Sequence, residues 1–140
     1  MTVEERIEAA FRLRAEGGNC AQAVVYALED KLSPEIDKTA LYKIMEGFGL
    51  GMGNMQNTCG ALSGAVAAAG LLNSNGDPSK STKGATYKLT KEMIRRFEEK
   101  NKAIMCKDLK GVETGTMLRS CPGCIEDAIR IACDVLEIRD

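Results

Sequence analysis

Hydrophobic residues recur along most of the chain at the spacing of an amphipathic helix, and no segment shows the alternation expected of a strand. The first helical stretch follows Thr2-Val3-Glu4-Glu5, which has the Thr-x-x-Glu form of a capping box, and Gly17-Gly18 favours its end. Asn19 is then placed to cap a second helix over residues 20 to about 31. The pattern therefore predicts an all-α protein.

Turn-forming residues separate the remaining predicted helices, beginning with Ser33-Pro34, which is typical of a helix start. The expected ranges are 33 to about 47, 57 or 58 to 72, a long stretch after the turn-rich segment 73–78, and about 121 to 136. The stretch 107–120 is weakly patterned. We expect a single compact domain of about five to six helices over residues 1–140.

The predicted fourth helix has a face of small residues, with Gly60 and Gly64 among several alanines. Small side chains let another backbone approach closely, so we expect this helix to lie at the centre of the fold. The glycine beside Cys59 also leaves room there for a second sulfur or a ligand.

Composition narrows the chemistry, because the chain has six cysteines and no histidine. The lack of histidine excludes Cys–His nucleophile pairs, Ser–His–Asp triads and histidine-ligated zinc or haem iron. The 19 basic and 20 acidic residues give a net charge of −1, so no charge excess points to nucleic acid or to an anionic membrane. Special chemistry is therefore expected to rest on cysteine.

The sequence favours a cytoplasmic protein. Its start lacks the basic segment and apolar stretch of a signal peptide, and the longest apolar run, 61–72, is interrupted by Ser63, Gly64 and Gly70. That run is shorter than the about 20 residues that span a bilayer. Thiols stay reduced in the cytoplasm, so six cysteines indicate ligands or redox groups before a disulfide framework. The alternative is a buried packing role, which we expect for the mid-helix Cys133.

Three cysteines fall at predicted helix starts. Cys20 follows the Asn19 cap, Cys59 follows a predicted cap at Thr58, and Cys121 begins the last helix. Each thiol would face unpaired backbone N–H groups and the positive end of a helix dipole, which favour thiolate over thiol.

The segment Cys121-Pro122-Gly123-Cys124 is a Cys-x-x-Cys motif at a helix start. Such a pair can close a small disulfide or offer two thiolates to a metal. The preceding residues do not supply the strand of a thioredoxin fold, so that fold is excluded. A four-ligand metal site would need Cys20, Cys59 or Cys106 as well, and there is no second Cys-x-x-Cys to strengthen this hypothesis.

Three motifs together resemble the C_GCAxxG_C_C family over about residues 17 to 136. They are Asn19-Cys20-Ala21-Gln22-Ala23, Thr58-Cys59-Gly60-Ala61-Leu62-Ser63-Gly64, and the later pair Cys106 and Cys121. The family label spells Gly-Cys-Ala where this chain has Cys59-Gly60-Ala61. The resemblance implies redox activity with Cys20, Cys59, Cys106 and Cys121 as the motif cysteines. Cys124 is supported less by the family pattern and more by its own spacing.

The leading hypothesis is a thiol–disulfide redox protein, with thiol–disulfide oxidoreductase as the enzyme class left open. The candidate site residues are Cys20, Cys59, Cys106, Cys121 and Cys124. Cys20, Cys59 or Cys121 would attack, and a neighbour such as Cys124 would resolve the mixed disulfide. No cofactor is required, and the partner is a redox protein or a small thiol rather than nucleic acid or a membrane. A homo-oligomer is left open.

Two other classes of protein are compatible with the pattern. One is a metal or iron–sulfur protein without catalysis, holding zinc or a cluster through Cys20, Cys59, Cys106 and Cys121. The other is a helical interaction module with buried cysteines. The redox and metal hypotheses both require several sulfurs to converge, because Cα separations above about 7 Å forbid a direct bridge.

Overall fold

The structure is a computed structural model that describes residues 1–32 and 34–140. Within this part of the chain there are seven α-helices and no strand beyond an isolated bridge between Thr58 and Met105. The α-helices are α1 (Val3–Ala15), α2 (Cys20–Leu28), α3 (Lys38–Glu46), α4 (Gly60–Asn73), α5 (Lys83–Asn101), α6 (Cys106–Lys110) and α7 (Cys121–Val135). Shorter helical turns are η1 (Glu29–Lys31), η2 (Gly51–Met55) and η3 (Pro78–Lys80). The all-α prediction is confirmed.

The first two helices begin at the predicted caps. Thr2 and Glu5 form a reciprocal capping box at α1, with the Thr2 hydroxyl accepting from the Glu5 N–H and the Glu5 carboxylate accepting from the Thr2 N–H. Asn19 and Gln22 make the same arrangement at α2. Each box satisfies backbone N–H groups that the helix itself leaves unpaired.

The number of helices was predicted too low. The missing one is α6, five residues long, in the region that the sequence pattern left weak. So short a helix does not complete enough turns to show a periodic hydrophobic face. The second predicted helix is also shorter than expected, because α2 ends at Leu28 and the chain continues into η1.

Two predicted helix starts were wrong or lie outside the described residues. The predicted cap at Ser33 lies outside the described residues, and α3 begins only at Lys38. There the Asp37 carboxylate accepts from two backbone N–H groups and acts as the cap. At α4, Cys59 itself occupies the cap position, because Thr58 is held in the bridge to Met105.

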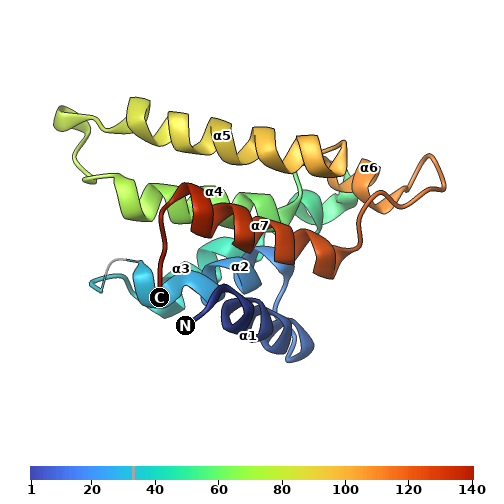
Figure 1. Cartoon of the computed structure of the whole chain (residues 1–140), viewed down its shortest axis with the longest axis horizontal. Coiled ribbons are helices and arrows are strands. Elements are labelled where there is room, and N and C mark those ends of the chain that lie inside the picture. Colours follow the sequence, from blue (N-terminus) through green and yellow to red (C-terminus); the bar gives the residue numbers. More distant parts are fainter. Residues whose placement is uncertain (33) are drawn as a thin grey trace.

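Helix α4 lies at the centre of the bundle and packs against α2, α5 and α7, with α5 on one side and α1 on the opposite side (Figure 1). The small-residue face explains the close packing of α4 on α2. A Cβ added at Gly64 would come within 2.8 Å of the Ala21 carbonyl oxygen, so only glycine allows this separation. The predicted central position of this helix is confirmed.

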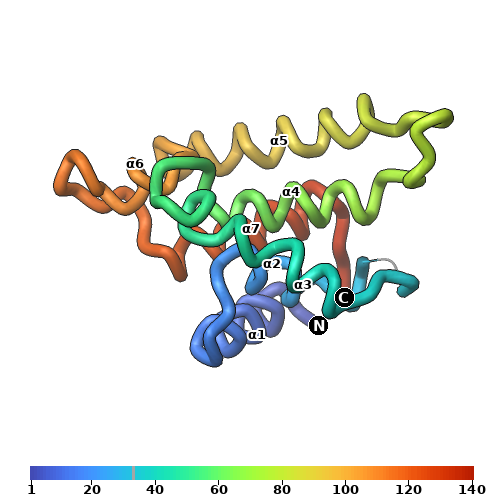
Figure 2. Tube along the Cα trace, turned by 180° about the vertical axis from the view of Figure 1, so that it is seen from behind, coloured from blue at the N-terminus to red at the C-terminus, as the bar shows by residue number. Residues whose placement is uncertain are grey.

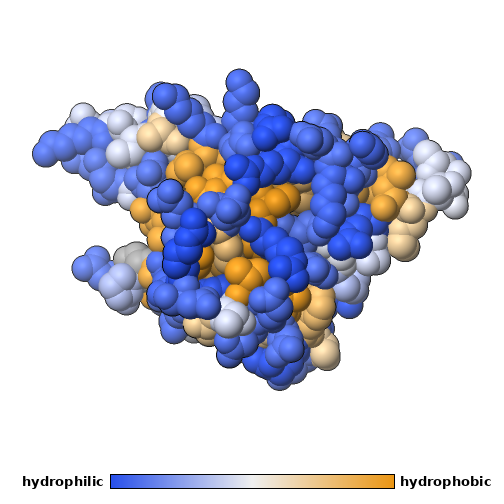
Figure 3. Space-filling view, in the orientation of Figure 1, coloured by the Kyte–Doolittle hydropathy of each residue, from blue (hydrophilic) through white to orange (hydrophobic). Residues whose placement is uncertain are grey.

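One buried cluster of apolar side chains joins the helices of the bundle. On the face shown in Figure 3, hydrophilic residues cover most of the surface, and hydrophobic residues show between the helices. In the described residues, no helix has the length and hydrophobicity needed to cross a bilayer.

The tube view in Figure 2 shows that the segment around η2 lies beside α6, in agreement with the contacts between these two elements. This is the end of the bundle at which α2, α4, α6 and α7 begin (Figure 1). The fold therefore gathers several helix N-termini in one place.

Candidate functional site

A cavity of about 450 Å³ lies where these helices begin, and five of the six cysteines line it. They are Cys20, Cys59, Cys106, Cys121 and Cys124. The structure thus brings together all five cysteines that the sequence analysis selected. Cys133 is instead buried in the apolar cluster, as expected for a packing residue.

Local capping places these sulfurs at the cavity. Cys20 and Cys121 are the first residues of α2 and α7, where the side chains of Asn19 and Ser120 cap the helices. Cys106 is likewise the first residue of α6. A side chain in the first turn lies next to backbone N–H groups without intrahelical partners, which gives this end of the bundle a positive potential.

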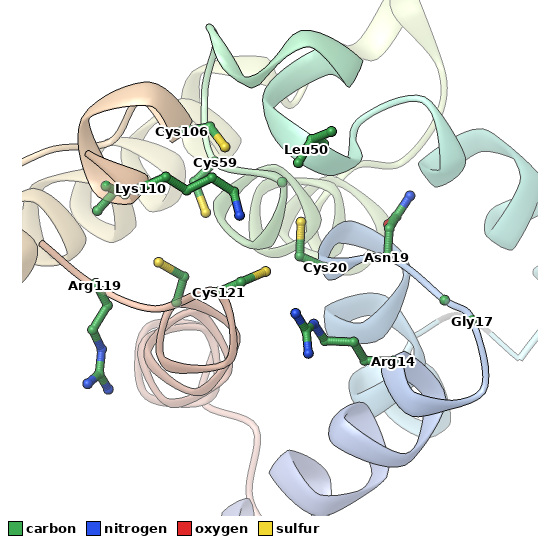
Figure 4. A pocket seen from close by; sticks show the side chains of 14 residues that line it. Arg14, Gly17, Asn19, Cys20, Leu50, Cys59, Cys106, Lys110, Arg119 and Cys121 are labelled. Atoms are coloured by element: carbon green, nitrogen blue, oxygen red, sulfur yellow. The ribbon is translucent and has the colours of Figure 1, made fainter. Parts of the chain in front are cut away.

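The thiols of Cys20 and Cys121 face each other across the cavity, and we call these two residues the outer pair (Figure 4). The Cys20 thiol directs its hydrogen bond at Cys121, which lowers the pKa of Cys121 to about 6 against the opposing effect of burial. The positive charges of Arg14 and Lys110 lower this pKa further. The Cys121 thiolate and burial together raise the pKa of Cys20. At neutral pH these shifts favour a thiolate on Cys121 beside a protonated thiol on Cys20.

A second pair, which we call the inner pair, consists of Cys59 and Cys124. The Cys124 thiol directs its hydrogen bond at Cys59 and lowers the pKa of Cys59, helped by the Ala61 and Leu62 N–H groups. The contact with Cys59 and burial raise the pKa of Cys124, which is 2% exposed. The two thiols of the Cys-x-x-Cys motif thus each face a cysteine of another helix.

Cys106 also lines the cavity and belongs to neither pair. Burial raises the pKa of its thiol, and the positive charge of Lys110 opposes this effect only in part. It packs against Gly51, which has a φ of +57° and lies in a segment of left-handed backbone that includes Leu50 and Met52. This segment also places Leu50 at the cavity, where its N–H lies toward the sulfur of Cys20.

The absence of a side chain at Gly60 leaves space for the Cys20 sulfur of the outer pair next to Cys59 of the inner pair. A Cβ added at this position would lie 2.5 Å from the sulfur of Cys20 and 2.8 Å from the Phe48 carbonyl oxygen. Both distances are shorter than real Cβ contacts, so a side chain here would displace the outer pair. The prediction that the glycine beside Cys59 leaves room for a second sulfur is confirmed.

Two cations at the cavity were missed by the sequence analysis. Arg14, at the end of α1, and Lys110, at the end of α6, both point toward the sulfurs in Figure 4. The guanidinium of Arg119 points away from them and pairs with the buried carboxylate of Asp127. Nothing in the linear pattern marks Arg14 or Lys110, because each is an ordinary charged residue near a helix end that only folding brings to the cysteines.

In the described parts, 1–32 and 34–140, no three or more His, Cys, Asp or Glu side chains form a group that could hold a metal ion. A structural metal requires about four ligands converging on one point, whereas four of these thiols are arranged as two hydrogen-bonded pairs. This pairing lends no support to the zinc or iron–sulfur alternative.

Comparison with known proteins identifies the family. The family model described as "Putative redox-active protein (C_GCAxxG_C_C)" matches residues 18–135. The chain belongs to this family, and the resemblance seen in its motifs is confirmed. A search of curated proteins and a search of solved structures each found no match.

Proposed function

We propose that this chain is a thiol–disulfide redox protein in which Cys121 attacks a disulfide and Cys20 resolves the resulting mixed disulfide. The observation that carries the proposal is the outer pair, a thiolate beside a protonated thiol at a cavity. A thiolate is the nucleophile in thiol–disulfide exchange, and the best attacking thiol has a pKa near the ambient pH. A pKa of about 6 makes Cys121 the stronger nucleophile of the pair.

The chemistry is a two-electron exchange. The Cys121 thiolate attacks one sulfur of the substrate disulfide, whose S–S bond breaks and releases one thiolate that takes a proton from water. Cys20 then loses its proton to water and attacks the Cys121 sulfur, releasing the second substrate thiolate, which also takes a proton from water. The protein dithiol is oxidised to a Cys20–Cys121 disulfide, and the substrate disulfide is reduced to two thiols.

In the inner pair, as in the outer pair, a thiol with a raised pKa donates a hydrogen bond to a sulfur with a lowered pKa. This likeness supports a second redox-active dithiol. Cys59 has the lowered pKa and Cys124 the raised one. In the proposed function it closes a Cys59–Cys124 disulfide by the same exchange, rather than a bond within the Cys-x-x-Cys motif. A reducing compartment such as the cytoplasm, where thiols are kept reduced, suits this chemistry.

Disulfide mapping tests the proposal. The reduced protein is oxidised in thiol–disulfide buffers of graded potential, the free thiols are trapped, and bonded peptides are identified by mass spectrometry. We expect a reversible Cys20–Cys121 bond, abolished in Cys121→Ser and retained in Cys133→Ser, which removes a thiol outside the cavity. The proposal is overturned if oxidation produces no bond between Cys20 and Cys121. Stoichiometric metal in anaerobically purified protein would overturn it as well.

A further inference from the structure

The charges around the cavity are unbalanced. Arg14, Lys110 and Arg119 line it, the last of them paired with Asp127, whereas none of its lining residues in the described part of the chain is an aspartate or a glutamate. In the described part of the chain, no ion pair joins Arg14 or Lys110 to a carboxylate. This excess is local, because the chain as a whole has a net charge of −1.

Arg14 and Lys110 carry more positive charge than one thiolate can neutralise. The thiolate at Cys121 contributes one negative charge, against the two positive charges of Arg14 and Lys110 that line the same cavity. The N-termini of α2, α4 and α7 add partial positive charge on the same side. Arg14 has five N–H donors, so a contact with the Cys121 sulfur leaves others for a ligand.

The charge balance also changes during the reaction. When the Cys121 thiolate forms a mixed disulfide it becomes neutral, and both cations then lose their counter-charge. A carboxylate on the bound half of the substrate would replace it, which stabilises the intermediate relative to one formed from a neutral substrate.

From the cavity and its two cations, and building on the proposed function, we infer that the substrate is a small disulfide bearing carboxylate groups. Arg14 and Lys110 bind its carboxylates, and its sulfurs reach Cys121. A volume of about 450 Å³ is in the range of small-molecule pockets. Disulfides with cationic groups are disfavoured by the same charges.

Three aliphatic disulfides of similar size test the inference: 3,3′-dithiodipropionate with two carboxylates, bis(2-hydroxyethyl) disulfide without charge, and cystamine with two ammonium groups. Each oxidises the reduced protein at about pH 8, where all three keep these charges. Formation of the Cys20–Cys121 bond is followed by trapping and mass spectrometry. Every rate is divided by the rate of the same disulfide with free 2-mercaptoethanol, which removes differences in intrinsic reactivity.

We expect the normalised rates to fall from the dicarboxylate to the neutral disulfide to cystamine, with about tenfold between the extremes at low salt. About 0.5 M salt should reduce this preference, because it screens exposed charges. The double variant Arg14→Gln/Lys110→Gln should bring the ratio close to one. The matched control Arg12→Gln/Lys107→Gln, on the same helices but away from the cavity, should keep it.

The use of rate ratios separates this inference from the proposed function. Loss of Arg14 also weakens the Cys121 thiolate, but this slows all three disulfides equally. If none of the three forms the Cys20–Cys121 bond, the proposed function itself fails. If the bond forms with equal normalised rates, with a preference for cystamine, or with a preference that survives the double variant, only the substrate inference is overturned.

Discussion

Removing the thiol of Cys20 should raise the pKa of Cys121. Its hydrogen bond to Cys121 is the largest single cause of the lowered pKa at that site. The substitution Cys20→Ala removes this donor and leaves the other stabilising groups, Arg14 and Lys110, in place. Because the donor favours the charged form, its loss favours the protonated form.

The magnitude follows from the two extremes of ionisation. At pH 7, a thiol with a pKa of about 6 is about nine-tenths thiolate, whereas an ordinary thiol with a pKa of about 8.5 is about 3% thiolate. Complete loss of the stabilisation would thus reduce the thiolate fraction of Cys121 about thirtyfold. Since the two cations remain, we expect a reduction of about tenfold.

The assay is the pH dependence of alkylation of Cys121 by iodoacetamide, followed peptide by peptide in the reduced protein. The midpoint of the profile reports the pKa of Cys121 and does not depend on the intrinsic nucleophilicity of the thiolate. The control Cys133→Ala removes a buried thiol elsewhere and should leave the midpoint unchanged. An unchanged midpoint in Cys20→Ala would refute the assigned role of the outer pair.

Three further predictions concern stability. The lowered pKa of Cys121 stabilises the reduced protein at pH values above about 8.5, the pKa of this thiol in the unfolded chain, and the stabilisation is lost as the pH falls through about 6. The difference in urea midpoint between wild type and Cys121→Ala should therefore grow from pH 6 to 8.5. A difference that stays constant over this range would contradict the lowered pKa. Gly60→Ala should lower the free energy of unfolding by about 1–3 kcal/mol, because an added Cβ would meet a sulfur at 2.5 Å and a carbonyl oxygen at 2.8 Å. In the same helix, a Cβ at Gly70 meets no atom within 4 Å, so Gly70→Ala should raise the free energy of unfolding by up to about 1 kcal/mol. Equal effects in denaturant unfolding would exclude the steric explanation. Asp127→Asn should lower the free energy of unfolding by about 2 kcal/mol, because this carboxylate is 0% exposed and accepts from a lysine, an arginine and an asparagine. The exposed Asp134 serves as the control, and Asp134→Asn should cost less than about 1 kcal/mol. Similar losses of stability in thermal unfolding would count against the buried network.

The positions of most helices could be predicted because their signals are local. A capping box at Thr2 or Asn19 involves residues within one turn, and its hydrogen bonds are the same in any fold. The prediction failed where the local signal was weak or ambiguous. The helix α6 is too short to show a period, and Thr58 lost its predicted capping role to a bridge with a distant residue, Met105.

The sequence by itself also indicated the candidate cysteines: Cys20 and Cys59 follow predicted caps, Cys121 and Cys124 form a Cys-x-x-Cys motif, and Cys106 came from the family resemblance. It could not determine how they pair. Cys121 and Cys124 are neighbours on one helix turn, yet their thiols face Cys20 on α2 and Cys59 at the start of α4. Their partners depend on the packing of α7 against α2 and α4, which no local spacing specifies.

The charge around the thiols was likewise decided only by the tertiary structure. Arg14 and Lys110 are far apart in the chain, and each lies in a surface position that a linear pattern assigns to solvent. Side-chain hydrogen bonds and the electric field of a cation act through space, not along the chain. The pKa of Cys121 therefore depends on the packed arrangement of the helices, which brings Cys20, Arg14 and Lys110 to it. Local sequence determined most of the helices and placed Cys20 and Cys121 at helix starts, whereas the packing of α7 against α2 and α4 determined which thiols meet.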